Sequence, residues 1–224
     1  LIDACIDKGV KRVVALSTDK ASSPINLYGA TKLASDKLFV AGNAYSGEHG
    51  TQFSVVRYGN VMGSRGSVIP FFMSIRDSGV LPITDTRMTR FMISLEEGVE
   101  LVWKAFGDMV GGEIYVKKIP SMQVVDVARV IAPDAKHEIV GIRPGEKIHE
   151  QMIGLEDSFY TYEYSDYFKI LPQINDWHEA QSRIKDGVKV SADFVYTSGS
   201  NTEWMTDHQL RTWIDQNADK IGTI

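Results

Sequence analysis

The sequence predicts an α/β protein in which part of a parallel sheet is joined to a smaller mixed α+β lobe. Two apolar runs rich in β-branched residues, 12–17 and 52–58, flank a segment at 27–44 with the pattern of a helix. Strand, helix and strand in this order form a parallel βαβ crossover. We therefore assign residues 1–60 to the carboxyl-terminal part of a Rossmann-type sheet. Residues 61–224 are assigned mainly to the second lobe, from which short segments can return to the sheet.

The remaining elements follow from periodicity and from the positions of glycine and proline. A helix is predicted at 67–79 because Pro70 falls in its first turn, where proline is tolerated, and Gly79 ends it. The segment 95–106 has the apolar spacing of an amphipathic helix. Further helices are expected at 124–131 and 145–153, strands at 82–85, 90–94, 111–119 and 137–142, and a half-buried strand in the aromatic stretch 159–168.

The bulk composition excludes several classes of protein. The 224 residues are 43% hydrophobic, which is enough for a packed core and argues against disorder. The net charge of −5 arises from 24 basic and 29 acidic residues that are interspersed along the chain. Because no basic cluster is present, we expect neither nucleic acid nor anionic lipid as a partner. A small polar metabolite is the expected partner.

Cysteine use and apolar run lengths bear on the location of the protein. The single cysteine, Cys5, cannot form an intramolecular disulfide, which fits a reducing compartment. No apolar run approaches the roughly 18 residues of a membrane span, so we expect a cytoplasmic protein without membrane insertion. Residues 1–9 resemble the last turns of a helix that leads into the first strand, so we expect a segment upstream.

The segment 17–32, STDKASSPINLYGATK, carries the most chemical information. Tyr28 and Lys32 are four residues apart in the predicted helix and therefore share a face. An ammonium group beside a phenol favours the phenolate, which can exchange protons near neutral pH. YxxxK alone is a weak signal. It becomes stronger here because Thr18 ends the preceding strand and can hydrogen-bond the same substrate oxygen as Tyr28.

Asp19 and Lys20 follow directly after that strand. An adjacent acid and base in a loop usually form a solvated ion pair with no chemical role. Here the pair lies at the carboxyl end of a parallel strand, which is where open α/β sheets bind their ligands. This position favours a functional role for both residues.

Four segments together resemble a known family. They are the segment 17–32, SVVRYGNVMGSRGSVIPFF at 54–72, ITDTRMTRFMIS at 83–94 and GIRPGEKIHE at 141–150. They are similar to the inverting UDP-N-acetylglucosamine 4,6-dehydratases of the pseudaminic acid pathway, which are extended short-chain dehydrogenases. The similarity extends over essentially the whole chain. It implies an NADP cofactor, UDP-N-acetylglucosamine as the substrate, and a homo-oligomer in the complete enzyme.

The resemblance also implies a role for each residue at the end of the first strand. Tyr28, with Thr18 and Lys32, removes the C4 hydroxyl proton, and Tyr28 and Lys32 also contact the cofactor. Lys20 then removes the C5 proton, and Asp19 donates a proton to the departing C6 oxygen. Inversion requires a proton from the opposite face of C5, and the sequence does not identify its donor. Because no GxGxxG turn follows a strand, we expect this chain to bind NADP weakly or not at all.

The nucleotide half of the substrate is assigned to four residues of the second lobe. By the resemblance, Arg143 and Arg90 bind the diphosphate, Glu146 accepts a ribose hydroxyl, and Asn60 binds a phosphate or the sugar. Without the family pattern, an exposed arginine at a helix start and an asparagine in a glycine-rich turn need no ligand. No metal site is expected, since the acidic and histidine side chains have no ligand spacing and are interpreted as solvated: His137, Glu138, His149 and Glu150.

Three alternatives remain open at the level of the sequence. A UDP-hexose 4-epimerase shares YxxxK but has no elimination step, and the adjacent Asp19 and Lys20 argue against it. A C5-retaining 4,6-dehydratase differs only in one proton donor. The chain can also be a non-catalytic nucleotide-sugar-binding module, because it has no glycine-rich phosphate turn.

Overall fold

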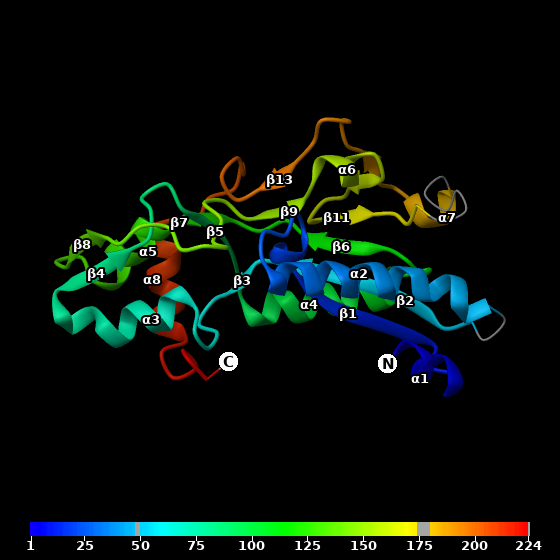
Figure 1. Cartoon of the computed structure of the whole chain (residues 1–224), viewed down its shortest axis with the longest axis horizontal. Coiled ribbons are helices and arrows are strands. Elements are labelled where there is room, and N and C mark those ends of the chain that lie inside the picture. Colours follow the sequence, from blue (N-terminus) through cyan, green and yellow to red (C-terminus); the bar gives the residue numbers. More distant parts are fainter. Residues whose placement is uncertain (48–49, 174–179, 224) are drawn as a thin grey trace. The chain divides into compact units, whose positions relative to one another are not determined.

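The computed structural model describes residues 1–47, 50–173 and 180–223 (Figure 1). These residues form two compact units that each draw on three parts of the chain. Unit 1 comprises Leu1–Tyr58, Glu96–Lys118 and Gln151–Tyr196, and unit 2 comprises Gly59–Leu95, Ile119–Glu150 and Thr197–Ile224. No helix among the described residues has both the length and the apolar character needed to cross a bilayer.

Unit 1 is built on one six-stranded sheet with the order β1-β2-β6-β11-β10-β12. Strands β1, β2 and β6 run parallel, and the following three are antiparallel to their neighbours. Its elements are α1 (Ile2–Asp7), β1 (Arg12–Thr18), the 3-10 turn η1 (Asp19–Ala21), α2 (Leu27–Ser46), β2 (Gln52–Tyr58), α4 (Leu95–Asp108), β6 (Ile114–Lys117), β9 (Gln151–Ile153), α6 (Leu155–Ser158), β10 (Thr161–Glu163), β11 (Tyr167–Ile170), α7 (Gln181–Ile184) and β12 (Val188–Lys189).

Helices cover both faces of the parallel part of this sheet. On one face, Phe39 of α2 packs against Phe53 of β2, with 6.2 Å between ring centroids. On the other face, Val56 of β2 packs with Leu101 and Ala105 of α4. Successive side chains of a strand point to opposite faces, so β2 anchors one helix on each side. This helix–sheet–helix layering confirms the predicted α/β class.

Helix α2 begins where the sequence supplies an N-cap. The side chain of Asn26 accepts a hydrogen bond from the Gly29 amide at 2.8 Å. Gly29 also allows close packing, because a Cβ there would lie 2.5 Å from the carbonyl oxygen of Lys20. The first turn of α2 therefore rests directly against η1.

Unit 2 contains a three-stranded sheet, β3-β5-β7, and a parallel pair, β4-β8. Its elements are β3 (Asn60–Val61), α3 (Val68–Ile75), the 3-10 turn η3 (Arg76–Ser78), β4 (Val80–Ile83), β5 (Thr89–Ile93), β7 (Ser121–Gln123), α5 (Val124–Ile131), β8 (Lys136–Ile139) and α8 (Asp207–Gln216). The two-residue strand β13 (Tyr196–Thr197) contains the last residue of unit 1 and the first of the final unit 2 segment.

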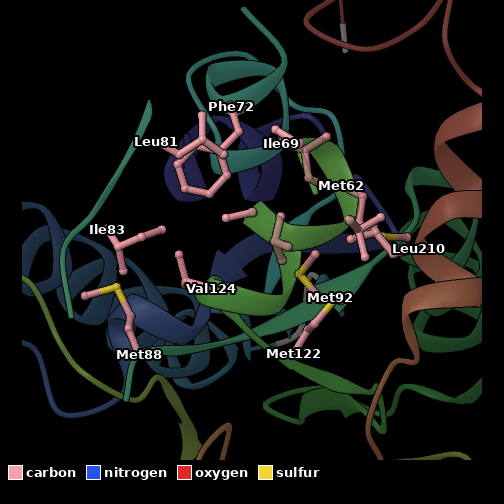
Figure 2. Packing of buried hydrophobic residues seen from close by; sticks show 14 residues of the cluster. Met62, Ile69, Phe72, Leu81, Ile83, Met88, Met92, Met122, Val124 and Leu210 are labelled. Atoms are coloured by element: carbon pink, nitrogen blue, oxygen red, sulfur yellow. The ribbon is translucent and has the colours of Figure 1, made fainter. Parts of the chain in front are cut away.

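The core of unit 2 is rich in methionine. Figure 2 shows Phe72 and Leu81 facing the same interior as Met92 and Met122. Leu210 of α8 joins this cluster and is fully buried. The flexible thioether side chains fill an irregular space between short strands and helices.

Two predicted elements are wrong. The helix expected at 145–153 does not form: residues 141–150 follow an irregular path with a turn at Gly145, which has φ +82°, and then enter β9. The aromatic stretch 159–168 is not one strand, because a turn separates β10 from the start of β11. Apolar spacing over so few residues does not distinguish a short helix from an irregular segment with buried positions.

Candidate functional site

The end of β1 presents three polar side chains in a chain of hydrogen bonds. The Thr18 hydroxyl donates to Oδ1 of Asp19 at 2.7 Å, and Nζ of Lys20 donates to the same oxygen at 3.0 Å. Asp19 is fully buried, whereas the Lys20 side chain is 34% exposed. Among the described residues, the other oxygen of Asp19 has no hydrogen-bond partner. A buried carboxyl group with one unused oxygen is suited to proton transfer with a ligand.

Tyr28 and Lys32 lie in the first turns of α2, beside this group. The contact of Gly29 with the Lys20 carbonyl brings the start of α2 against η1. Tyr28 is 54% exposed, so its phenol is accessible to a ligand. Nζ of Lys32 donates to the Leu16 carbonyl of β1 at 3.3 Å, which draws the ammonium back toward the strand. The structure thus brings together the five residues assigned to unit 1.

A second phenol near Tyr28 was missed by the sequence analysis. Tyr58 ends β2 and is the register partner of Thr18 on β1. Burial raises the pKa of Tyr58 above its usual value, and the Tyr28 phenol raises it further. The signal available in the sequence was its place at the end of the neighbouring parallel strand.

Arg57 of β2 holds α2 against the sheet through a buried ion pair. Its guanidinium donates to Asp36 of α2 at 3.1 Å, to the Met152 carbonyl at 2.6 Å and to Asp157 at 3.3 Å. The side chains of Arg57 and Asp36 are only 3% and 2% exposed. Asp36 is four residues after Lys32, on the helix face that also carries Tyr28, so this buried pair fixes the face that bears the site.

The four residues assigned to the nucleotide line one pocket within unit 2. Its volume is about 610 Å³, and it is formed by Asn60, Gly66, Ser67, Val68, Pro70, Phe71, Phe72, Pro82, Thr84, Met88, Arg90, Val124, Val140, Arg143 and Glu146. Polar side chains and apolar ones both contribute to the wall. A pocket of this kind fits a ligand that has a flat apolar part and an anionic part.

Two buried oxygens at this pocket have no hydrogen-bond partner among the described residues. They are Oδ1 of Asn60 and Oγ of Ser67. Ser67 is the N-cap residue of α3, but its side chain does not cap the helix. Its hydroxyl and the positive end of α3 are therefore available to an anion. The sequence analysis did not identify Ser67, although a serine directly before an apolar helix is a recognisable N-cap.

The two arginines of the pocket differ in how they are held. Nη1 of Arg90 donates to the carbonyls of Thr89 at 2.7 Å and Ile148 at 3.2 Å, and Nη2 donates to Sδ of Met88 at 3.0 Å. The Arg143 side chain has no partner among the residues that the structure describes, and only its amide contacts the Glu146 carboxylate, at 3.3 Å. The guanidinium of Arg143 is thus more available than that of Arg90 for bidentate hydrogen bonds to a diphosphate.

The expectation that four acidic and histidine side chains are solvated is wrong for Glu150. This residue is 4% exposed, and Oε1 lies 3.8 Å from Nε of Arg90. His149 is exposed but is not free, because Nδ1 is 2.8 Å from the buried Thr89 hydroxyl. These contacts were not predictable from the sequence, since both residues occur in a segment without regular periodicity.

Comparison with known proteins gives relatives over nearly all of the chain. UDP-N-acetylglucosamine 4,6-dehydratase (inverting) from Campylobacter jejuni subsp. jejuni serotype O:2 is 53% identical over 218 residues, which cover 94% of this chain and 65% of the relative. UDP-glucose 4-epimerase from Rickettsia conorii is 38% identical, covering 88% of this chain and 60% of the epimerase. The chain therefore spans less than two thirds of the length of these relatives.

A solved structure and a family model agree with this result. The X-ray structure of Pen from Bacillus thuringiensis matches with a TM-score of 0.83 and 32% identity, over 96% of this chain and 65% of that one. The model of a family described as polysaccharide biosynthesis protein matches residues 1–172. The motifs at the end of β1, the α/β fold and these matches agree, and the chain belongs to this polysaccharide biosynthesis protein family.

Proposed function

We propose that the protein catalyses NADP-dependent, C5-inverting 4,6-dehydration of UDP-N-acetylglucosamine. The product is a UDP-4-keto-6-deoxy-L-hexose for a surface glycan of the pseudaminic acid type. One observation carries the proposal: at the end of β1, the buried Asp19 carboxyl group accepts hydrogen bonds from Thr18 and Lys20. The 53% identity to an inverting dehydratase supports it independently.

Tyr28 is assigned to the first proton transfer. The exposed side chain, as the phenolate, accepts the proton of the C4 hydroxyl and becomes the phenol, and the positive charge of Lys32 favours the phenolate. Thr18 is placed to orient the same substrate oxygen. The hydroxyl of Thr18 now donates to Asp19, so it would have to rotate toward the substrate or accept a hydrogen bond from it.

Lys20 and Asp19 are assigned to the elimination. Lys20, as an amine, accepts the C5 proton, which the C4 ketone makes acidic. Asp19, as a carboxylic acid, donates a proton to the departing C6 oxygen, so that the hydroxyl leaves as water. The 3.0 Å hydrogen bond holds the two side chains next to each other at the end of β1. The unpartnered oxygen of Asp19 is assigned to the leaving group.

The residues present fit the nicotinamide end of NADP. The accessible Tyr28 phenol and Lys32 would contact the nicotinamide ribose, beside the end of β1. NADP, when bound, supplies reversible hydride transfer. No GxGxxG turn follows a described strand of unit 1, and none of the residues named above is assigned to the pyrophosphate of NADP.

The pocket of unit 2 is proposed to bind the UDP half. Arg143 and the α3 N-terminus would bind the diphosphate, the Ser67 hydroxyl would donate a hydrogen bond to it, and Oδ1 of Asn60 would accept one from a sugar hydroxyl. Arg90 would add a second positive charge, and Glu146 would accept a ribose hydroxyl. The apolar wall near Phe71 and Val124 is suited to the uracil ring.

UDP-hexose 4-epimerase activity is the second candidate, supported by the 38% identity to UDP-glucose 4-epimerase. Epimerisation needs Tyr28 but no acid and base for an elimination. The contact between Asp19 and Lys20 favours the dehydratase. A C5-retaining dehydratase differs in the donor of one proton, to which none of the residues above is assigned.

Incubation of the protein with UDP-N-acetylglucosamine and NADP at a concentration high enough to offset weak cofactor binding, followed by NMR of the products, tests the proposal. A 4-keto-6-deoxy sugar is expected, and Lys20→Ala should abolish it. Asp207→Asn, which removes an exposed charge of α8, is the matched control and should leave turnover unchanged. A 4-epimer as the only product would establish the second candidate. Tight UDP binding without any turnover when NADP is shown to be bound would instead establish a non-catalytic binding module.

A further inference from the structure

A buried carboxylate lies behind one of the two guanidinium groups of the unit 2 pocket. Oε1 of Glu150 is 3.8 Å from Nε of Arg90, and the side chains are 5% and 15% exposed. A buried carboxylate needs a cation or hydrogen-bond donors to remain charged. Arg90 is the cation that the structure places beside it, and Glu150 itself does not line the pocket.

The backbone around Glu150 is held rigidly. The Glu150 amide donates to Oγ of the buried Ser198 at 2.9 Å, and the Ser198 amide donates to the Glu150 carbonyl at 2.8 Å. Two residues earlier, the Ile148 carbonyl accepts a hydrogen bond from the Thr89 amide at 3.0 Å. The backbone is therefore held at Glu150 itself and two residues before it, which fixes the point from which the carboxylate extends toward Arg90.

The same segment restricts the guanidinium of Arg90. Nη1 is occupied by the Thr89 and Ile148 carbonyls, and Nη2 contacts Sδ of Met88. With Glu150 facing Nε, the plane of the guanidinium is fixed by contacts along its edges. A guanidinium has five N–H donors, so the remaining Nη2 hydrogen is the one that can be directed into the pocket.

We propose that Glu150 is a positioning residue that fixes Arg90 in the orientation that binds the diphosphate of the nucleotide. The inference rests on the proposed function of the pocket. Without the carboxylate, Nε of Arg90 loses the charged group that faces it, so the orientation of the guanidinium is less restricted before the ligand binds, and restricting it at that step weakens affinity. Glu150 thus acts on the ligand only through Arg90.

A double-mutant cycle with UDP as the ligand tests this role. Calorimetry on the full chain compares wild type, Glu150→Gln, Arg90→Ala and the double variant. We expect Glu150→Gln to raise the Kd for UDP about tenfold, and the double variant to bind no more weakly than Arg90→Ala alone, because coupled residues are non-additive. The control Asp207→Asn breaks an exposed ion pair with Arg129 in the same unit and should leave the Kd unchanged.

Each outcome of the double-mutant cycle supports or overturns the proposed role of Glu150. An unchanged Kd in Glu150→Gln overturns the inference, as does an unchanged Kd in Arg90→Ala. Effects that multiply in the double variant overturn it too, since Glu150 would then act independently of Arg90. If Glu150→Gln does not fold, Glu150→Asp replaces it, because the shorter side chain withdraws the carboxylate from Arg90. Absence of UDP binding by wild type would overturn the proposed function of the pocket, and the wild-type titration alone reveals it.

Discussion

The buried pair of Arg57 and Asp36 gives the sharpest prediction about stability. Asp36→Asn keeps the size of the side chain but removes the charge that faces Arg57 at 3.1 Å. Breaking a buried ion pair by removing one partner destabilises a protein by about 3–5 kcal/mol. Arg57 keeps the Met152 carbonyl and the carboxylate of Asp157, which is 21% exposed, so we expect the lower end, about 3 kcal/mol.

Thermal unfolding followed by circular dichroism measures this loss. For a chain of this size, about 3 kcal/mol corresponds to a fall in Tm of about 6–12 °C. The matched control is Asp207→Asn, whose partner Arg129 is 54% exposed, and an exposed pair contributes at most about 1 kcal/mol. If the two variants lose the same stability, the buried cluster does not anchor α2 in the way that the structure indicates.

Three further predictions concern the pocket, the start of α2 and a surface loop. Arg143→Ala should weaken UDP binding by about 1.5–3 kcal/mol in calorimetry, with partial recovery in Arg143→Lys; equal affinity in all three proteins would contradict the assignment. Gly29→Ala should lower the free energy of unfolding, measured by urea denaturation, by about 1–3 kcal/mol, because the new Cβ would clash with the Lys20 carbonyl oxygen. Gly98→Ala is the control and should not lower it, because the space around the added Cβ is open. Hydrogen bonds from the Arg87 side chain and, second, from its backbone amide lower the pKa of Asp85 to about 2, so the stability from this pair is present above the ordinary pKa and is lost as the pH falls through about 2. Arg87→Ala keeps the amide and should move the carboxyl NMR titration of Asp85 part of the way back toward about 3.9, and an unmoved midpoint would exclude the Arg87 side chain as the cause.

The parallel part of the fold was predictable because its signals are local. The apolar β-branched strands around α2 gave the βαβ unit, and their carboxyl ends gave Thr18, Asp19 and Lys20. Tyr28 and Lys32 followed from helical spacing. The antiparallel continuation through β11, β10 and β12 was not predictable, since pairing with β6 depends on contacts between residues far apart in the chain.

The nucleotide pocket was predictable only in part. Asn60, Arg90, Arg143 and Glu146 were identified from motifs, and the structure brings them to one cavity. Glu150 was misjudged because its burial results from the irregular segment 143–150 packing against Thr89 and Ser198. No periodic pattern marks such a segment, so its buried charge is visible only in three dimensions.

The proton at C5 gives the most direct test of the proposed dehydration. The protein is incubated with NADP and UDP-N-acetylglucosamine in deuterated water, and the product is analysed by NMR. If Lys20 removes the C5 proton and the C4 hydrogen is returned to C6, the product should be a 6-deoxy-4-keto sugar of inverted configuration. It should carry one solvent deuteron at C5 and a methyl group that contains the hydrogen from C4. A product without deuterium at C5 would contradict the proposal, because no base at the end of β1 would then remove that proton.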